Sequence, residues 1–221
     1  MQEDLLVLHN LQVLNIKLKV QARFVPKLFN SKKKFVGILG GTFDPPHEGH
    51  LFISKFAKIK LDISEVWWVV TTTNPLKKNR LNYEKRLKKV KKFLTNQHIK
   101  VLEIQDLSKN IYTIDVLEYL FKKFPQKKFI WLMGADALTN FHLWKDWKKI
   151  FYNIPIAIFD RPFYSLSIPK AQATLHFKEY KISSKLSKKL KFMKTPSWSF
   201  ITGLTHLQSS TKIRENKVGS T

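Results

Sequence analysis

The sequence predicts an α/β protein with a doubly wound parallel sheet of about five to six strands and helices on both faces. Two observations predict this fold. Short apolar runs that end at glycine or polar residues are typical of buried parallel strands, and segments of helical period separate these runs. The chain has 221 residues, 43% of them hydrophobic, so a single domain with a full core can form.

The predicted elements alternate along the chain. We expect strands at 35–39, 65–71, 99–104, 128–133, 155–159 and 198–202. We expect helices at 51–60, 83–94, 113–124, 143–151, 183–194 and 209–216. Because open parallel sheets bind ligands beyond the carboxyl ends of their strands, the chemistry should lie in the loops after the first, second, fourth and last strands.

The domain is expected to span residues 34–221, with residues 1–33 as an N-terminal extension. In the extension, a mixed apolar stretch at 5–18 precedes a basic stretch at 27–34. Three interpretations stay open: a segment that packs loosely on the surface, a start codon placed too early, and an arm that binds a partner.

Composition excludes several classes of protein. The chain has no cysteine, which excludes disulfides, thiolate zinc sites and cysteine nucleophiles. Its apolar runs, such as 66–70, are far shorter than the roughly 18–20 residues that span a bilayer. The acidic start, Met1-Gln2-Glu3-Asp4, is unlike a targeting peptide. We therefore expect a cytoplasmic protein without a membrane partner.

The net charge of +24 first indicates a nucleic-acid partner. However, of the 40 basic residues only five are arginine, and readers of bases and phosphates rely on the arginine fork for bidentate contacts. This ratio favours a surface that has drifted toward lysine, so we expect no nucleic-acid partner. A site for small anions is compatible with either interpretation.

The motif at 40–50, Gly-Gly-Thr-Phe-Asp-Pro-Pro-His-Glu-Gly-His, directly follows the first predicted strand. Gly40 and Gly41 let the backbone approach a ligand closely. The Asp-Pro-Pro turn should start a helix near His47 and place His50 on the same face. Backbone N–H groups, a helix N-terminus and two imidazoles all stabilise anions. The alternative is a tight turn with two surface histidines.

Two further motifs follow later strands. Ser209-Ser210-Thr211 can cap a helix and still offer groups to phosphate, with Arg214 one turn on, although a plain N-cap explains the hydroxyls equally well. Gly134-Ala135-Asp136 follows the fourth predicted strand, and Trp144 stands ten residues beyond the glycine. A flat aromatic side chain can stack on a ligand ring, or it can serve packing alone.

Together these motifs resemble the nucleotidyltransferase superfamily with the (H/T)-x-G-H motif, whose fold is Rossmann-like, over about residues 35–215. The Gly-Ala-Asp motif and Trp144 resemble the bacterial nicotinate-mononucleotide adenylyltransferases. The resemblance implies that ATP and nicotinate mononucleotide give nicotinate adenine dinucleotide and pyrophosphate, in NAD biosynthesis, by direct in-line transfer. It also implies Mg²⁺ bound mainly through substrate phosphates, without protein ligands.

The resemblance also assigns roles to residues of this chain. It implies that His47 and His50 are catalytic. The residues that would bind ATP or its phosphates are Gly40, Gly41, Thr42, Phe43, Gly134, Asp136, Ser209, Ser210, Thr211 and Arg214. Those that would bind the mononucleotide are Lys77, Thr113, Trp144 and Arg161.

Smaller elements carry the mononucleotide assignments. Asn74-Pro75-Leu76-Lys77 resembles the N-P-x-K loop of the family, Tyr112-Thr113-Ile114-Asp115 resembles its Y-T-x-D element, and Asp160-Arg161-Pro162 resembles its D-R-P loop. For Lys77, Arg86 and Arg161, a solvated surface charge is an equally good interpretation. Two residues depart from the family pattern: Val116 replaces a threonine, and Gln208 replaces an apolar residue.

Other functions remain to be excluded. A sister enzyme on the same fold would use nicotinamide mononucleotide or another phosphate-ester acceptor. A non-catalytic polyanion-binding protein would use the +24 charge and leave the histidine motif inert. A module like those of class I tRNA synthetases has a related motif, but 221 residues leave little room for an anticodon domain. The sequence leaves open whether the protein forms a homo-oligomer.

Overall fold

The computed structural model describes residues 35–71, 81–95, 97–104, 112–160 and 170–203. Its strands are β1 (Phe35–Gly41), β2 (Glu65–Val70), β3 (Lys100–Leu102), β4 (Lys128–Gly134), β5 (Ile156–Phe159), β6 (Lys181–Ile182) and β7 (Trp198–Ile201). Its α-helices are α2 (Glu48–Leu61), α3 (Tyr83–Phe93), α4 (Thr113–Lys123), α5 (Ala135–Leu138), α6 (Trp147–Asn153) and α7 (Gln172–His176). Its 3₁₀ helices are η1 (Phe141–Leu143), η3 (Lys178–Tyr180) and η4 (Ser184–Phe192).

The strands form one parallel sheet in the order β3-β2-β1-β4-β5-β7-β6. The chain moves outward from β1 in one direction to β3, then crosses to β4 and moves outward in the other. This arrangement confirms the predicted doubly wound sheet. Within the described residues the sheet has seven strands, because β6 adds a two-residue pairing at one edge.

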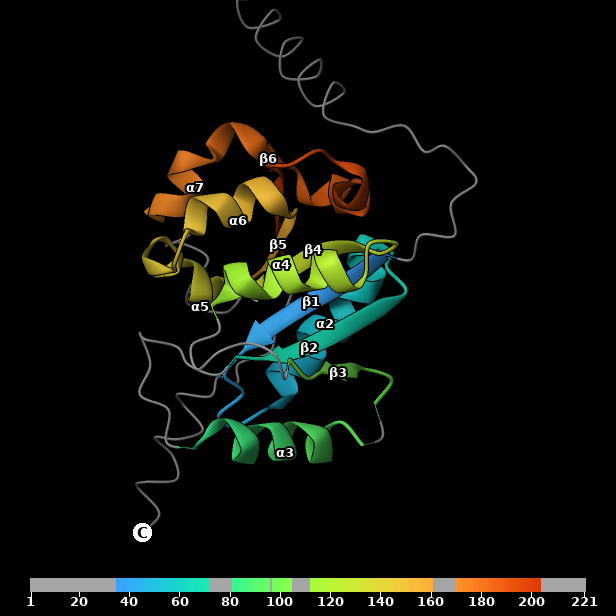
Figure 1. Ribbon diagram of the computed structural model, residues 1–221. Coiled ribbons are helices and arrows are strands. Elements are labelled where there is room, and N and C mark those ends of the chain that lie inside the picture. The colour runs from blue at the N-terminus through green and yellow to red at the C-terminus, as the bar shows by residue number, and fades with distance from the viewer. Residues whose placement is uncertain (1–34, 72–80, 96, 105–111, 161–169, 204–221) are drawn as a thin grey trace, which may run out of the picture.

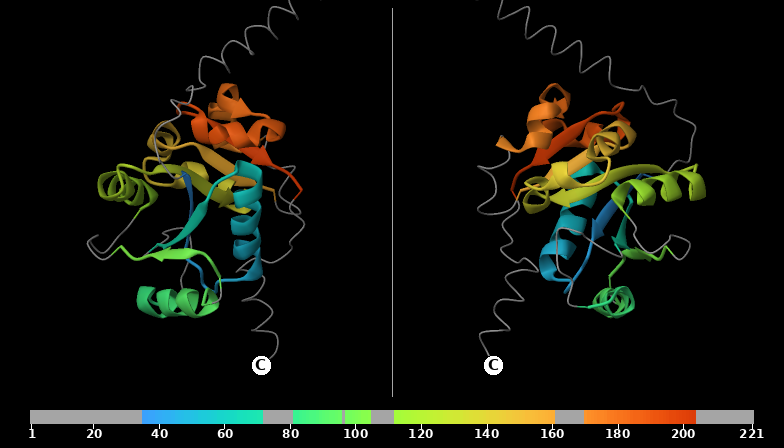
Figure 2. Two further views of the ribbon diagram at one scale, coloured as in Figure 1. Left: turned by 90° about the vertical axis from the view of Figure 1, so that its right-hand side faces the viewer. Right: turned by 60° about the vertical axis from the view of Figure 1, so that its left-hand side comes forward.

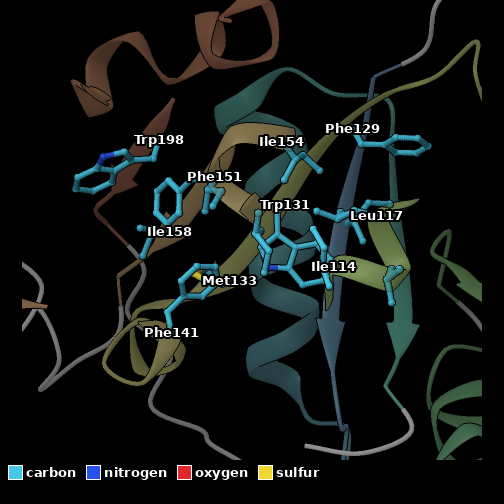
Figure 3. Close-up of a cluster of buried hydrophobic side chains, with 14 of the residues drawn as sticks. Ile114, Leu117, Phe129, Trp131, Met133, Phe141, Phe151, Ile154, Ile158 and Trp198 are labelled. Carbon is cyan, nitrogen blue, oxygen red and sulfur yellow. The ribbon is translucent and has the colours of Figure 1, made fainter. Parts of the chain in front are cut away.

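Helices cover both faces of the sheet and bury two hydrophobic clusters (Figures 1 and 2). On one face, α4, α6 and α7 pack over side chains such as Ile38 and Trp131, some of which Figure 3 shows. On the other face, α2, α3 and η4 pack over side chains such as Leu39 and Trp68. Alternate residues of β1 thus enter opposite clusters, as expected of a strand covered on both sides.

The expected helices differ from the structure at several points. The helix expected at 51–60 begins earlier, at Glu48, and its residue Ile59 is 69% exposed. The helix expected at 143–151 is η1 followed by α6, and the one expected at 183–194 is the 3₁₀ helix η4. The helix expected at 209–216 and the extension at 1–33 lie outside the described residues.

The two halves of the sheet separate at its centre. The described ladder between β1 and β4 ends at Leu39 and Leu132, two residues before either strand ends. On their other sides, β1 continues to pair with β2 up to Gly41, and β4 with β5 up to Gly134. The carboxyl ends of β1 and β4 therefore diverge where the strand order reverses, which is where doubly wound sheets bind their ligands.

In the part of the chain that the structure describes, no helix is long and apolar enough to cross a membrane.

Candidate active site

The two histidines of the first motif stand where β1 leads into α2. His47 is the N-cap of α2, and its Nδ1 accepts a hydrogen bond of 3.1 Å from the backbone N–H of Gly49. His50 lies in the first turn, and its Nδ1 accepts a hydrogen bond of 3.3 Å from the backbone N–H of His47. The two ring centroids are 3.7 Å apart. The structure thus brings together the two residues that the motif singled out.

These hydrogen bonds determine the tautomer of both imidazoles. A neutral imidazole has one N–H donor and one acceptor nitrogen. Because Nδ1 accepts in both rings, we infer that Nε2 carries the proton in both. His47 and His50 are therefore hydrogen-bond donors through Nε2, at a helix N-terminus whose dipole also favours anions.

An aromatic stack supports the turn between β1 and α2. Phe43 has a left-handed backbone, with φ of 47°, and its ring stacks on Trp68 at 4.6 Å and 7°. The centroid of the Phe43 ring lies 4.8 Å from that of His50. The stack holds a backbone conformation that costs a non-glycine residue about 1–2 kcal/mol.

A short chain of hydrogen bonds links Trp68 to His50. The indole Nε1 of Trp68 donates to Ser54 Oγ at 2.8 Å, and Ser54 Oγ donates to the carbonyl of His50 at 2.9 Å. Sequence reasoning missed Trp68 and Ser54 as supports of the site. The available signal was the pair Trp67-Trp68 in a buried strand, which also fits ordinary core positions.

The two glycines at the end of β1 differ in their surroundings. A Cβ on Gly40 would lie 2.3 Å from Cη2 of Trp131, so packing alone requires glycine there. A Cβ on Gly41 would lie 3.4 Å from the Phe43 ring, which is a normal contact. Packing therefore does not explain the glycine at position 41. Close approach of the backbone to a ligand would explain it. That either glycine binds ATP stays a prediction.

The Gly-Ala-Asp motif lies at the end of β4, facing the end of β1 across the divergence of the sheet. Gly134 is the last residue of β4 and the N-cap of the short helix α5, and Asp136 lies in the first turn of that helix. The backbone carbonyl of Asp136 accepts a hydrogen bond of 2.9 Å from Thr139 Oγ1, which closes the turn. The placement agrees with a nucleotide site, and binding of a nucleotide by Gly134 and Asp136 stays a prediction.

Thr113 and Trp144 belong to segments that contact each other. Trp144 directly follows η1 and is half-buried, with its ring 4.8 Å from that of Phe141. The next residue, Lys145, forms an ion pair of 3.8 Å with Asp115 and lies over the Tyr112 ring at 4.7 Å. Thr113, the first residue of α4, stands between these two partners in the sequence.

The carboxylate of Asp115 also stabilises the start of α4. Asp115 Oδ2 accepts a hydrogen bond of 2.9 Å from the backbone N–H of Tyr112, and Thr113 is buried at 8% exposure.

The tryptophans differ in their exposure. Trp144 is half-buried, whereas four others are at most 2% exposed: Trp67, Trp68, Trp131 and Trp198. Partial exposure leaves Trp144 available to a ligand ring, as the stacking hypothesis requires.

Arg86 is not a solvated surface charge, the interpretation that the sequence left open. Its side chain is 1% exposed, and its guanidinium donates hydrogen bonds to backbone carbonyls in the loops after β1 and β2. The other predicted contacts lie outside the described residues. These are Lys77, Arg161, Ser209, Ser210, Thr211 and Arg214.

Among the described residues, no three histidine or carboxylate side chains are grouped as a metal site. Asp44 lies in the turn between β1 and α2, and Asp136 lies in the first turn of α5, after β4. That Mg²⁺ is bound mainly through substrate phosphates, without protein ligands, stays a prediction.

The chain is similar to known proteins over most of its length. A family model described as cytidylyltransferase-like matches residues 38–216. A protein of Ruegeria sp. (strain TM1040), named "Probable nicotinate-nucleotide adenylyltransferase", is 36% identical over 181 residues, which cover 81% of this chain and 96% of the relative. A protein of the same name from Rhizobium meliloti (strain 1021) is 37% identical over 186 residues, which cover 83% of this chain and 99% of the relative.

A solved structure has the same fold at lower sequence identity. Plasmodium falciparum nicotinic acid mononucleotide adenylyltransferase complexed with NaAD aligns with a TM-score of 0.58 and 18% identity. The alignment covers 82% of this chain and 83% of that chain. At this identity the similarity supports the fold.

Proposed function

Since the chain belongs to the cytidylyltransferase-like family, we propose that it is a nicotinate-nucleotide adenylyltransferase of NAD biosynthesis. Its substrates are ATP and nicotinate mononucleotide, and its products are nicotinate adenine dinucleotide and pyrophosphate. The observation that carries this proposal is the pair His47 and His50, which present Nε2 donors beside the point where β1 and β4 diverge. The named relatives, similar over nearly their whole length, support the choice of substrates.

The reaction needs positioning and charge stabilisation more than covalent chemistry. A phosphate oxygen of nicotinate mononucleotide attacks the α-phosphorus of ATP, forming a new P–O bond. The bond from the α-phosphorus to the oxygen that bridges to the β-phosphate breaks, and pyrophosphate leaves with the electron pair. No covalent enzyme intermediate forms, so the enzyme's task is to align the two phosphates and stabilise the departing charge.

The residues of the first motif suit this task. The Nε2 donors of His47 and His50 hydrogen-bond the triphosphate as negative charge develops on it. The N-terminus of α2 adds backbone N–H groups and a favourable dipole. Backbone N–H groups near Thr42 and Phe43 hold a phosphate at the end of β1. Gly134 and Asp136 bind the nucleotide from the end of β4.

We further propose that Mg²⁺ enters with ATP, bound to phosphate oxygens and water. Bound there, the cation would supply charge that offsets the phosphates and favours the departure of pyrophosphate. We place the reaction in the cytoplasm, in agreement with a chain that has no cysteine.

An assay of pyrophosphate release with ATP and a panel of acceptors tests the proposed function. We expect nicotinate mononucleotide to give the highest kcat/KM, with nicotinamide mononucleotide and phosphopantetheine clearly lower. Higher kcat/KM with the amide would make the protein a sister enzyme of different acceptor specificity. No pyrophosphate release with any acceptor, together with tight salt-sensitive RNA binding, would favour the polyanion-binding alternative.

Replacing Trp144 by alanine should raise KM for nicotinate mononucleotide about tenfold and change KM for ATP much less. The reason is that an aromatic stack on a ligand ring contributes about 1 kcal/mol or somewhat more. Trp147→Ala is the matched control, since Trp147 is also half-buried and packs against Phe177 at 6.0 Å. Equal KM changes for both substrates in Trp144→Ala would assign Trp144 to packing.

A further inference from the structure

Arg86 is a buried cation in an otherwise lysine-rich helix. It lies in α3, whose neighbouring lysines Lys85, Lys88 and Lys89 are exposed, yet Arg86 itself is 1% exposed. Burying a guanidinium without partners would cost several kcal/mol, so its contacts should explain why it is there.

The guanidinium joins two loops at the active-site edge of the sheet. Nη1 donates to the carbonyl of Thr42 at 2.7 Å and to the carbonyl of Thr71 at 2.8 Å. Thr42 follows β1 and Thr71 follows β2, while Nε donates to the carbonyl of Leu81, just before α3, at 3.2 Å. A single side chain thus connects the carboxyl ends of two adjacent strands with the start of the helix.

The contact with Thr42 determines the direction of a neighbouring N–H group. The carbonyl of Thr42 and the N–H of Phe43 belong to the same peptide unit, which is planar and trans. In a trans peptide these two groups point in opposite directions. When Arg86 holds the Thr42 carbonyl toward α3, the Phe43 N–H must therefore point away from α3.

The charge of Arg86 also strengthens this N–H group as a donor. A cation hydrogen-bonded to the carbonyl polarises the peptide, and cooperative polarisation of this kind strengthens the opposite N–H. Burial lowers the pKa of Arg86 and the nearby charge of Asp44 raises it, but an arginine remains protonated at neutral pH. The positive charge is thus permanent and lies directly behind the Thr42–Phe43 peptide.

We propose that Arg86 is a positioning residue that aims the N–H of Phe43 at a phosphate of ATP. The proposal rests on the proposed function, in which this peptide holds phosphate. Arg86 would not touch the substrate, and its effect would pass through the peptide that it holds.

The test compares Arg86→Lys and Arg86→Met with Val90→Ala. Val90 lies one turn further along α3 and is fully buried, so its truncation weakens the packing of the same helix without removing the link between the loops. We would measure the equilibrium Kd for Mg·ATP by calorimetry and kcat with nicotinate mononucleotide, at a temperature where thermal melts show all variants folded. Lysine keeps the charge, but its ammonium ends one bond short of Nη1, which donates to both carbonyls, and it lacks the Nε–H that donates to Leu81.

We expect both Arg86 variants to raise Kd for ATP and lower kcat about tenfold each, with Val90→Ala close to wild type in both. If Arg86→Met fails to fold, Arg86→Lys alone decides. A folded Arg86→Lys protein with wild-type Kd and kcat would overturn the proposal, and so would equal losses in Val90→Ala. Wild-type protein that binds ATP but does not react with the mononucleotide would refute the proposed function alone, because the Kd comparison does not depend on the acceptor.

Discussion

Replacing His50 by alanine is expected to lower kcat about 10²–10³-fold with little change in KM for either substrate, since loss of one preorganised donor to developing charge has this effect. The expectation rests on the geometry of the pair. His50 Nδ1 is engaged by the backbone N–H of His47, so Nε2 carries the proton that can be donated to the triphosphate.

His47 needs a more careful substitution because it also caps α2. His47→Ala would remove the acceptor for the Gly49 N–H and cost about 1 kcal/mol of stability in addition to any catalytic loss. His47→Asn keeps a good N-cap while removing the Nε2 donor, so it separates the two roles. We expect kcat to fall by orders of magnitude with a nearly unchanged melting temperature.

His98→Ala serves as the matched control, because His98 is exposed on the loop before β3. Steady-state pyrophosphate release and thermal melts of all four variants make the comparison. Unchanged turnover in both His50→Ala and His47→Asn would refute the catalytic assignment of the pair.

Replacing Gly40 by alanine is expected to destabilise the fold by about 3 kcal/mol, the upper range for overpacking a core. The new Cβ would lie 2.3 Å from Cη2 and 2.6 Å from Cζ2 of Trp131. Neither the strand backbone nor the buried indole ring can move easily to relieve these contacts. Trp131 is 1% exposed within the cluster of Figure 3, and Gly40 is paired with Val69 in the sheet. Urea unfolding of the variant, compared with wild type, measures the loss.

Two further variants make this prediction specific. Trp131→Phe removes the indole atoms that the new Cβ would meet, so the double variant should lose less stability than the sum of the single variants. Gly41→Ala should unfold at nearly the wild-type urea concentration, because its Cβ would meet Phe43 at an ordinary 3.4 Å. If the backbone at Gly41 approaches phosphate, the same variant should weaken ATP binding. Additive losses in the double variant would show that the contact with Trp131 is not the cause.

The sequence predicted the parts of the fold that are coded by local pattern. Each of the six expected strands exists, because an apolar run ended by glycine or polar residues specifies a buried parallel strand. β6 escaped prediction since two residues, Lys181 and Ile182, carry no periodicity. The stretch 183–194 reads as an α-helix, but Ser187 and Leu190 are buried at a spacing of three, which suits the 3₁₀ helix that forms.

The site was predictable to the extent that its residues are neighbours in the sequence. His47 and His50 share one motif, so their proximity follows from helix geometry. The burial of Arg86 depends on carbonyls 44 and 15 positions away, and pattern alone assigns an arginine between lysines to the surface. Trp68 likewise supports the site only because the fold places Phe43 on its ring.

Because the tryptophans are buried to different degrees, intrinsic tryptophan fluorescence can report on substrate binding. Trp67, Trp68, Trp131 and Trp198 are shielded from solvent, so their fluorescence should stay nearly constant when substrates bind. Trp144 and Trp147 are half-buried, and only the first lies in the segment expected to meet the nicotinate ring. In a Trp147→Phe background, quenching on addition of nicotinate mononucleotide would then come from Trp144, and a simple titration of emission would follow occupancy of the acceptor site without a label.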